Sequence, residues 1–173
     1  MSITLAELNQ LDQAEFTRVV GPVFENSPWI SETTWAQRPF ASVEHLHRAL
    51  GECVRAAGRE KQLALIRAHP DLVGRAALAG TLTRESTEEQ ASAGLNTLSP
   101  TEIALFQKQN AAYREKFGFP FVICARLNKK EAILAGFERR LKNSPAQEIE
   151  AALEEIFKIA ELRLRDLTQD RLI

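Results

Sequence analysis

Apolar side chains recur every three or four residues along most of the chain, which is the spacing of helices that bury one face. One series begins after Ser42, a residue type favoured at helix N-caps, and ends at Gly58. A second follows residues 99–102, SPTE, which combine an N-cap, a proline in the first turn and a capping-box acid, and it stops at Gly118. Both patterns predict long helices.

The same signals predict further helices between and beyond these two. N-cap residues followed by an acid or a proline occur at four more places: Thr4, Asp12, Asn128 and Ser144. Another helix is expected over 59–69, because Pro70 disfavours helical backbone at the residue before it. Asp71 is then expected to cap a short helical segment.

Two stretches break the helical period. Residues 26–41 contain both tryptophans and two prolines, which indicates a packed loop or short turns. Residues 119–125, FPFVICA, are strand-like but have no second strand to pair with, which favours buried extended chain or a helix start. With no repeat or linker dividing the series, the pattern predicts an all-α fold: one domain over 1–173, a bundle of about seven to nine helices without significant sheet.

The composition agrees with this fold and narrows the function. The 173 residues are 45% hydrophobic and 26% charged, as in one globular domain. The net charge of −1 and the lack of long like-charge runs disfavour a nucleic-acid partner, and no apolar window approaches a membrane span. Cys53 and Cys124 lie far apart behind no secretory signal, and the final residues, RLI, lack a peroxisomal address, so we expect a cytoplasmic protein.

Few residues indicate chemistry on their own. His69 falls at the end of its predicted helix, where backbone carbonyls favour the charged imidazolium of a proton donor, although such a histidine is more often solvated or a C-capping group. His45 and His47 are two residues apart on a helix and therefore do not form a zinc pair. Neither cysteine has a neighbour that would activate a nucleophile, and no cofactor signature is present. An enzyme of this sequence is expected to need no metal or organic cofactor.

Residues 86–90, STEEQ, allow two interpretations. Ser86 to Glu89 match a capping box, with the Ser86 hydroxyl accepting from the Glu89 N–H, and this needs no function. A helix start also presents free N–H groups to a ligand carboxylate or urea oxygen, and Gln90 adds an amide that both donates and accepts. Residue types alone favour the capping role.

Arg163 is the most unusual residue of the last predicted helix. It falls at the edge of an apolar arc, one turn beyond Ala160 and two beyond Ile156. A guanidinium there must reach outward to solvent, pair with an internal acid, or meet an anion in a cavity. The spacing leaves these three alternatives open.

Several blocks together make the chain resemble the family of 2-oxo-4-hydroxy-4-carboxy-5-ureidoimidazoline (OHCU) decarboxylases. The blocks are HPDL at 69–72, LTRESTEEQASAGL at 82–95 and FGFPFVICAR at 117–126, with support from NSPWI at 26–30 and IAELRLRDL at 159–167. They span nearly the whole chain in the family's order, and Val122 is a conservative departure from a position that more often holds isoleucine. The resemblance implies decarboxylation of OHCU to (S)-allantoin in urate catabolism by a cofactor-free, all-helical homodimer.

The resemblance also implies roles for individual residues. His69 matches the family's catalytic acid/base, Glu89 is expected to join it in catalysis, and Pro70 lines the ligand. Arg163 matches the family's arginine on the last helix, which favours an active-site cation. The remaining expected substrate contacts come from two segments: Ser86, Thr87, Glu88, Glu89 and Gln90, and the main chain of Phe121, Val122, Ile123, Cys124 and Ala125.

Two rival hypotheses remain at the level of sequence. The chain could be a non-catalytic helical module that binds a small ureide or a protein partner, although His69 would add little to binding a neutral ureide. It could also be a related cofactor-free decarboxylase or hydrolase acting on a different ureide. An assay with OHCU separates these readings.

Overall fold

The computed structural model describes residues 2–168 of the chain. Over these residues it contains ten α-helices, three short 3-10 helices and no strand, which confirms the all-α prediction. The helices outnumber the expected seven to nine because α3 (Trp29–Thr34) forms in a stretch without a sustained apolar period. The short segment expected after Asp71 is α6 (Arg75–Ala79). No helix in the described part of the chain is long and apolar enough to cross a membrane. The final residues, RLI, lie outside the described residues.

The chain divides into two compact units. The first covers Met1–Ala68 and Phe157–Ile173, and the second covers His69–Ile156. The long helix α10 (Pro145–Thr168) contributes residues to both. The expectation of a single domain over 1–173 stays a prediction.

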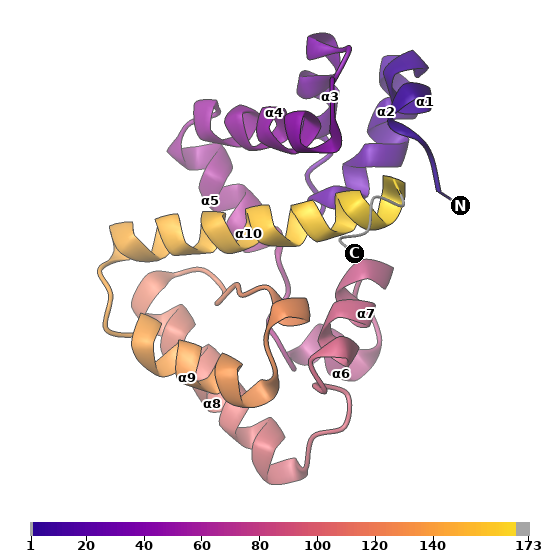
Figure 1. Cartoon of the computed structure of the whole chain (residues 1–173). Helices are drawn as coiled ribbons and strands as arrows, with labels where there is room; N and C mark the ends of the chain where they lie inside the picture. The colour runs from indigo at the N-terminus through magenta and orange to yellow at the C-terminus, as the bar shows by residue number, and fades with distance from the viewer. Residues whose placement is uncertain (1, 169–173) are drawn as a thin grey trace. The chain divides into compact units, whose positions relative to one another are not determined.

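The first unit contains α1 (Leu5–Gln10), α2 (Gln13–Val20), α3, α4 (Val43–Ala56), α5 (Arg59–Ala68) and the second part of α10 (Figure 1). Its predicted helix starts are confirmed: the side chains of Thr4, Asp12 and Ser42 each accept a backbone N–H three residues ahead. The predicted apolar face of α4 is buried, with Leu46, Leu50 and Val54 fully enclosed.

Residues 26–41 contain more regular secondary structure than the expected packed loop or short turns, namely α3 and a 3-10 turn at Trp35–Gln37. Trp35 donates its indole N–H to the carbonyl of Leu11 at 2.9 Å. The guanidinium of Arg38 lies 4.1 Å from the Trp35 ring centroid and also donates to Leu11. Trp35 therefore ties this segment to the end of α1 within the first unit.

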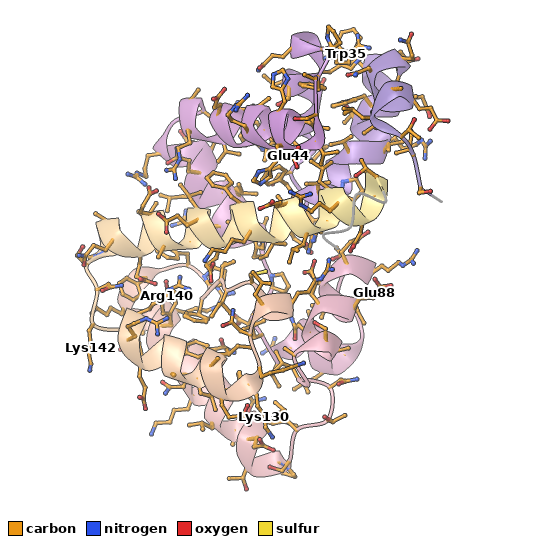
Figure 2. All side chains as sticks on the ribbon, viewed as in Figure 1. Trp35, Glu44, Glu88, Lys130, Arg140 and Lys142 are labelled. Atoms are coloured by element: carbon orange, nitrogen blue, oxygen red, sulfur yellow. The ribbon has the colours of Figure 1, made fainter. Side chains whose placement is uncertain are left out.

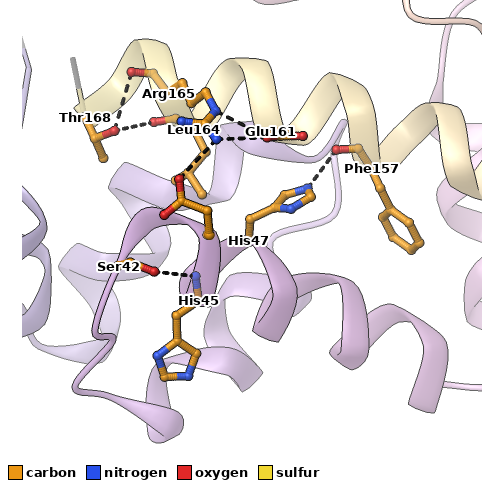
Figure 3. A network of polar contacts seen from close by, with 9 residues as sticks. Ser42, His45, His47, Phe157, Glu161, Leu164, Arg165 and Thr168 are labelled. Carbon is orange, nitrogen blue, oxygen red and sulfur yellow. Dashed lines mark hydrogen bonds and ion pairs between the residues drawn. The ribbon is translucent and has the colours of Figure 1, made fainter. Parts of the chain in front are cut away.

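The two histidines of α4 have separate partners, as their spacing predicts. The Nε2 atom of His47 lies 2.8 Å from the carbonyl of Phe157 on α10 (Figure 3). The ring of His45 meets that of Phe40 edge-on. Nearby on α10, Arg165 donates to Glu161 and to Glu44 of α4 (Figure 3). These contacts hold α4 beside the C-terminal part of α10.

The second unit contains α6, α7 (Arg84–Ser92), α8 (Pro100–Phe117), α9 (Lys130–Arg140) and the first part of α10. Helices α8 and α9 pack together (Figure 1). Between them lies an aromatic cluster centred on Tyr113, whose ring lies near four others: Phe117, Phe119, Phe121 and Phe137. The predicted capping box at Ser99 is present, and Gly118 ends α8 with a φ of 76°. The long predicted helix of this half is therefore confirmed.

The predicted caps at Asn128 and Asp71 are wrong. Helix α9 starts after Lys129, and the Asn128 amide donates to the carbonyl of Cys124 at 2.9 Å instead of capping the helix. Helix α6 starts after Gly74, and the carboxylate of Asp71 accepts from Arg114 at 2.9 Å. Asn128 bonds a carbonyl only four residues before it, whereas Asp71 bonds a side chain 43 residues away, and each bond competes with capping of the local backbone N–H groups.

Candidate active site

The segment after α5 forms a tight, buried turn. His69 is only 7% exposed and follows the last residue of α5, Ala68. Val73 has a φ of 53°, a left-handed conformation that is unusual and costly for a β-branched residue. Gly74 is buried, and a Cβ there would lie 2.6 Å from the Cβ of Asp71. The backbone after His69 is thus held in one strained shape that admits no side chain at position 74.

Side chains from two other helices hold this turn. The Gln90 side chain of α7 accepts the Val73 N–H at 3.1 Å and donates to the Asp71 carbonyl at 3.4 Å. From α8, Asn110 donates to the carbonyl of Leu72 at 2.7 Å. Gln90 and Asn110 are both buried, so these bonds form away from solvent. Gln90, expected to contact substrate, therefore also connects α7 to the turn that follows His69.

The predicted capping box at Ser86 is wrong, because α7 begins one turn earlier. Thr83 is the N-cap and accepts the Ser86 N–H at 3.3 Å, while the Thr87 N–H already donates to the Thr83 carbonyl at 2.9 Å. A threonine three residues ahead of the serine satisfies the first-turn N–H groups, which leaves Ser86 inside the helix. The expected helix start at 86–90, with free N–H donors, is therefore absent.

The side chains of α7 differ in where they lie. Ser86 and Gln90 are buried and Glu89 is half-buried. Thr87 is exposed and donates its hydroxyl back to the Thr83 carbonyl. Glu88 is exposed at the outer side of α7, where it pairs with Arg84 (Figure 2). The inner face of α7 thus carries three of the expected contacts, and its outer face carries the other two.

The segment predicted as buried extended chain or a helix start contains both: residues 121–124 are buried chain outside any helix, and Ala125 begins the 3-10 turn Ala125–Leu127. The Val122 carbonyl accepts from Arg140 at 2.6 Å, and the Cys124 carbonyl accepts from the Leu127 N–H at 3.1 Å. Within residues 2–168 we find no hydrogen-bond partner for the backbone N–H groups of Phe121 to Cys124. Buried N–H groups normally have partners, so this segment presents main-chain donors suited to a ligand.

Helix α7 and the extended segment lie together. Helix α7 packs against the 3-10 turn Ala125–Leu127, and Lys129 donates to the carbonyl of Ser92 at the end of α7. Burial raises the pKa of the Cys124 thiol, and the negative charges of Glu155 and Glu89 raise it further. Cys124 is therefore a neutral thiol at pH 7, and it lies close enough to Glu89 for that charge to raise its pKa.

Arg163 lies in the first unit, where it is 7% exposed. Its Nη1 atom donates to Glu25 Oε2 at 3.0 Å and to the Pro22 carbonyl at 3.1 Å. Of the three alternatives left open by the sequence, this contact is the pairing with an internal acid. A role for Arg163 toward substrate stays a prediction.

Glu148 is fully buried and pairs with Arg140, and no sequence pattern singled out either residue. The apolar arc predicted for α10 is narrower than the buried face, because Ala152 and Ile159 are buried outside it. Glu148 lies one turn before Ala152 on this wider face. The sequence signal that could have identified Glu148 is its place one helical turn before the apolar residue Ala152. No group of three or more His, Cys, Asp or Glu residues in the described part of the chain is arranged to hold a metal ion.

The OHCU decarboxylase family model matches residues 9–165. The chain belongs to this family. It is 43% identical over 169 residues to the OHCU decarboxylase of Halalkalicoccus jeotgali, covering 98% of this chain and 94% of that one. It is 44% identical over 165 residues to the Amia calva OHCU decarboxylase, covering 95% and 94% of the two chains. A crystal structure of (S)-allantoin synthase is similar with a TM-score of 0.74 and 27% identity, over 95% of this chain and 54% of the other.

Proposed function

We propose that this chain decarboxylates OHCU to (S)-allantoin in urate degradation. The observation that carries this conclusion is the family match over residues 9–165, together with relatives of that name aligned over nearly their full lengths. The geometry of the second unit supports it, because the His69 turn is bonded to α7 and α7 packs beside the extended segment. The chain is therefore a carboxy-lyase.

The reaction needs an electron sink, which the substrate itself supplies. Breaking the bond to the carboxylate carbon releases carbon dioxide and leaves an electron pair on the ring carbon. The pair forms a double bond to the neighbouring ureido-bearing carbon, while the C=N pair of that carbon moves onto its nitrogen, which takes up a proton, so neither pyridoxal nor thiamine is needed. A proton must then be added to one face of the ureido-bearing carbon to fix the S configuration, while the hydroxyl loses its proton and becomes the ring carbonyl. The protein's tasks are to orient the substrate and to deliver that proton.

His69 is the proposed acid/base. It is buried, and the strained turn that follows it is bonded by Gln90 and Asn110, which limits the positions open to its backbone. A positioned imidazole contributes about 10²- to 10⁴-fold to a rate by proton transfer. His69 would hydrogen-bond the hydroxyl or carboxylate region of OHCU and then protonate the ureido-bearing ring carbon.

Orientation is assigned to α7 and the extended segment. Glu89 would accept from the ureido and ring N–H groups of the substrate, and Ser86 and Gln90 lie on the same inner face of α7. The N–H groups of Phe121 to Cys124 would donate to substrate oxygens. Held in this way, the scissile carboxylate stands out of the ring plane, aligned with the π system, and less entropy is lost at the barrier.

The remaining assignments complete the proposal. Pro70 would line the ligand, Thr87 and Glu88 would contribute at the edge of α7, and Arg163 would orient an anionic or carbonyl oxygen. Strong binding of the departing carboxylate by Arg163 would stabilise the ground state as well as the transition state and would not raise kcat. We also propose that the protein is a cytoplasmic homodimer that works without a metal or organic cofactor.

An assay with freshly generated OHCU tests the function. The circular dichroism of (S)-allantoin is followed with and without enzyme, and again after chelator treatment. We expect accelerated, stereospecific product formation that survives the chelator. Binding of ureide without acceleration would instead indicate a binding module, and acceleration only with another ureide would indicate a related hydrolase or decarboxylase.

A further inference from the structure

A charged side chain holds the backbone of the extended segment. Arg140 ends α9 and is only 5% exposed. Its Nη1 atom donates to the Val122 carbonyl at 2.6 Å, and its guanidinium carbon lies 4.3 Å from the centroid of the Phe121 ring. One side chain therefore fixes a carbonyl of the segment and the ring of the preceding residue.

Arg140 is itself fixed by a buried carboxylate. Its Nε atom donates to Glu148 Oε1 at 2.8 Å, and Glu148 is fully buried. The Tyr113 hydroxyl donates to the same oxygen at 2.5 Å, and the Asn143 amide donates to Oε2 at 2.8 Å. Figure 2 labels Arg140 on α9. The carboxylate thus receives three donors and holds the guanidinium in one orientation.

Stability alone is a weak reason for this arrangement. Buried ion pairs lose the hydration of both partners, and well-packed apolar residues often replace them without loss of stability. An apolar side chain at position 140 would fill space but would supply no donor to the Val122 carbonyl. The property that only the charged group provides is therefore the anchoring of this backbone.

We propose that Arg140 is a positioning residue that sets the geometry of the substrate-binding backbone at 121–124. This inference rests on the proposed function. With the Val122 carbonyl and the Phe121 ring held, the N–H groups of Phe121 to Cys124 keep a fixed direction toward the substrate. Binding groups must be held to within about 0.5 Å for productive geometry, and small displacements cost rate steeply. Glu148 acts through Arg140.

The test removes the charges together so that neither is left buried alone. The variant combines Arg140→Met, Glu148→Leu and Tyr113→Phe, which leaves Asn143 half-exposed and able to bond water. We expect a melting temperature close to that of the parent protein, a loss of kcat on the order of 10²-fold, and lower stereochemical purity of the allantoin. A purely structural role would change the melting temperature without changing kcat or stereochemistry.

A matched control removes an ion pair elsewhere. Arg165→Met with Glu161→Gln abolishes the pair on α10 in the first unit, and we expect unchanged kcat, KM and stereochemistry. Glu148→Gln is the milder companion variant, expected to lower kcat several-fold by loosening Arg140. If the triple variant does not fold, the kcat of Glu148→Gln tests the inference.

Two results overturn the inference. One is a folded triple variant with parental kcat and stereochemistry, and the other is parental kinetics in Glu148→Gln when the triple variant does not fold. Absence of OHCU turnover by the parent protein would instead contradict the proposed function. The two failures are therefore distinguishable.

Discussion

The Gln90 side-chain oxygen accepts a hydrogen bond from the Val73 N–H at 3.1 Å, and Val73 is held with a φ of 53°. This bond stabilises a left-handed valine four residues after His69. Gln90 therefore has a structural task in addition to any substrate contact. Its replacement is expected to affect both stability and rate.

Gln90→Met leaves the buried Val73 N–H without its acceptor. The expected loss is about 1–3 kcal/mol in the free energy of unfolding, measured by urea denaturation, with a fall in kcat. Gln90→Glu is not a milder variant, because it loses the donor to the Asp71 carbonyl and buries a carboxylate. A Gln90→Met protein as stable as the parent would show that the bond to Val73 is unimportant.

His69→Asn should lower kcat by at least about 10²-fold while the melting temperature changes little. The reason is that asparagine preserves hydrogen bonding but cannot transfer the proton. Turnover is followed by circular dichroism of (S)-allantoin. His45→Asn, on α4 of the first unit, is the control and should retain activity. Near-parental stereospecific turnover in His69→Asn would remove this residue from the mechanism.

Thr83→Ala should destabilise the protein by about 1 kcal/mol because it removes the cap of α7. Glu89→Ala should leave α7 capped and instead raise KM or lower kcat through loss of a substrate contact. Urea denaturation and steady-state kinetics on both variants separate the two roles. A larger stability loss in Glu89→Ala than in Thr83→Ala would argue against this assignment of the cap.

Arg163→Met removes the cation that pairs with the buried carboxylate of Glu25. We expect the free energy of unfolding to fall by about 3–5 kcal/mol. Adding Glu25→Leu should restore most of that stability. If Arg163 also serves the substrate, activity should stay low in the double variant despite its recovered fold. Recovery of parental kcat and KM would assign Arg163 a structural role only.

Alkaline pH should destabilise the protein through Tyr113. Burial, and then the hydrogen bond to Glu148, raise the pKa of Tyr113 above its ordinary 10.0. The folded protein then binds more protons than the unfolded chain, so this contribution is complete below pH 10 and is lost as pH rises further. Tyr113→Phe should flatten the decline in unfolding free energy above about pH 10. An identical pH dependence in both proteins would contradict this.

Local signals predicted much of the fold. The caps at Thr4, Asp12, Ser42 and Ser99 were correct because each side chain bonds a backbone N–H only three residues away. The misplacement at Ser86 shows the limit of this reasoning, since Thr83 and Ser86 are both good cap residues separated by one turn. Nothing local decides between them.

The candidate site was predictable only in part. The buried extended segment at 119–125 could be inferred because strand-like residues had no partner strand. The pairing of Arg140 with Glu148, and of Arg163 with Glu25, depends on tertiary distances that one sequence does not encode in any short pattern. Residue types identified the charged groups, and only the coordinates identified their partners.

Gly74 limits how this enzyme could be re-engineered. Its backbone φ of −83° is one that any residue can adopt, so propensity scales would rate an alanine there as harmless or even beneficial. An alanine Cβ would instead collide with the Cβ of Asp71 and displace the turn that follows His69. Thermostability libraries built by replacing glycines should therefore leave this position untouched.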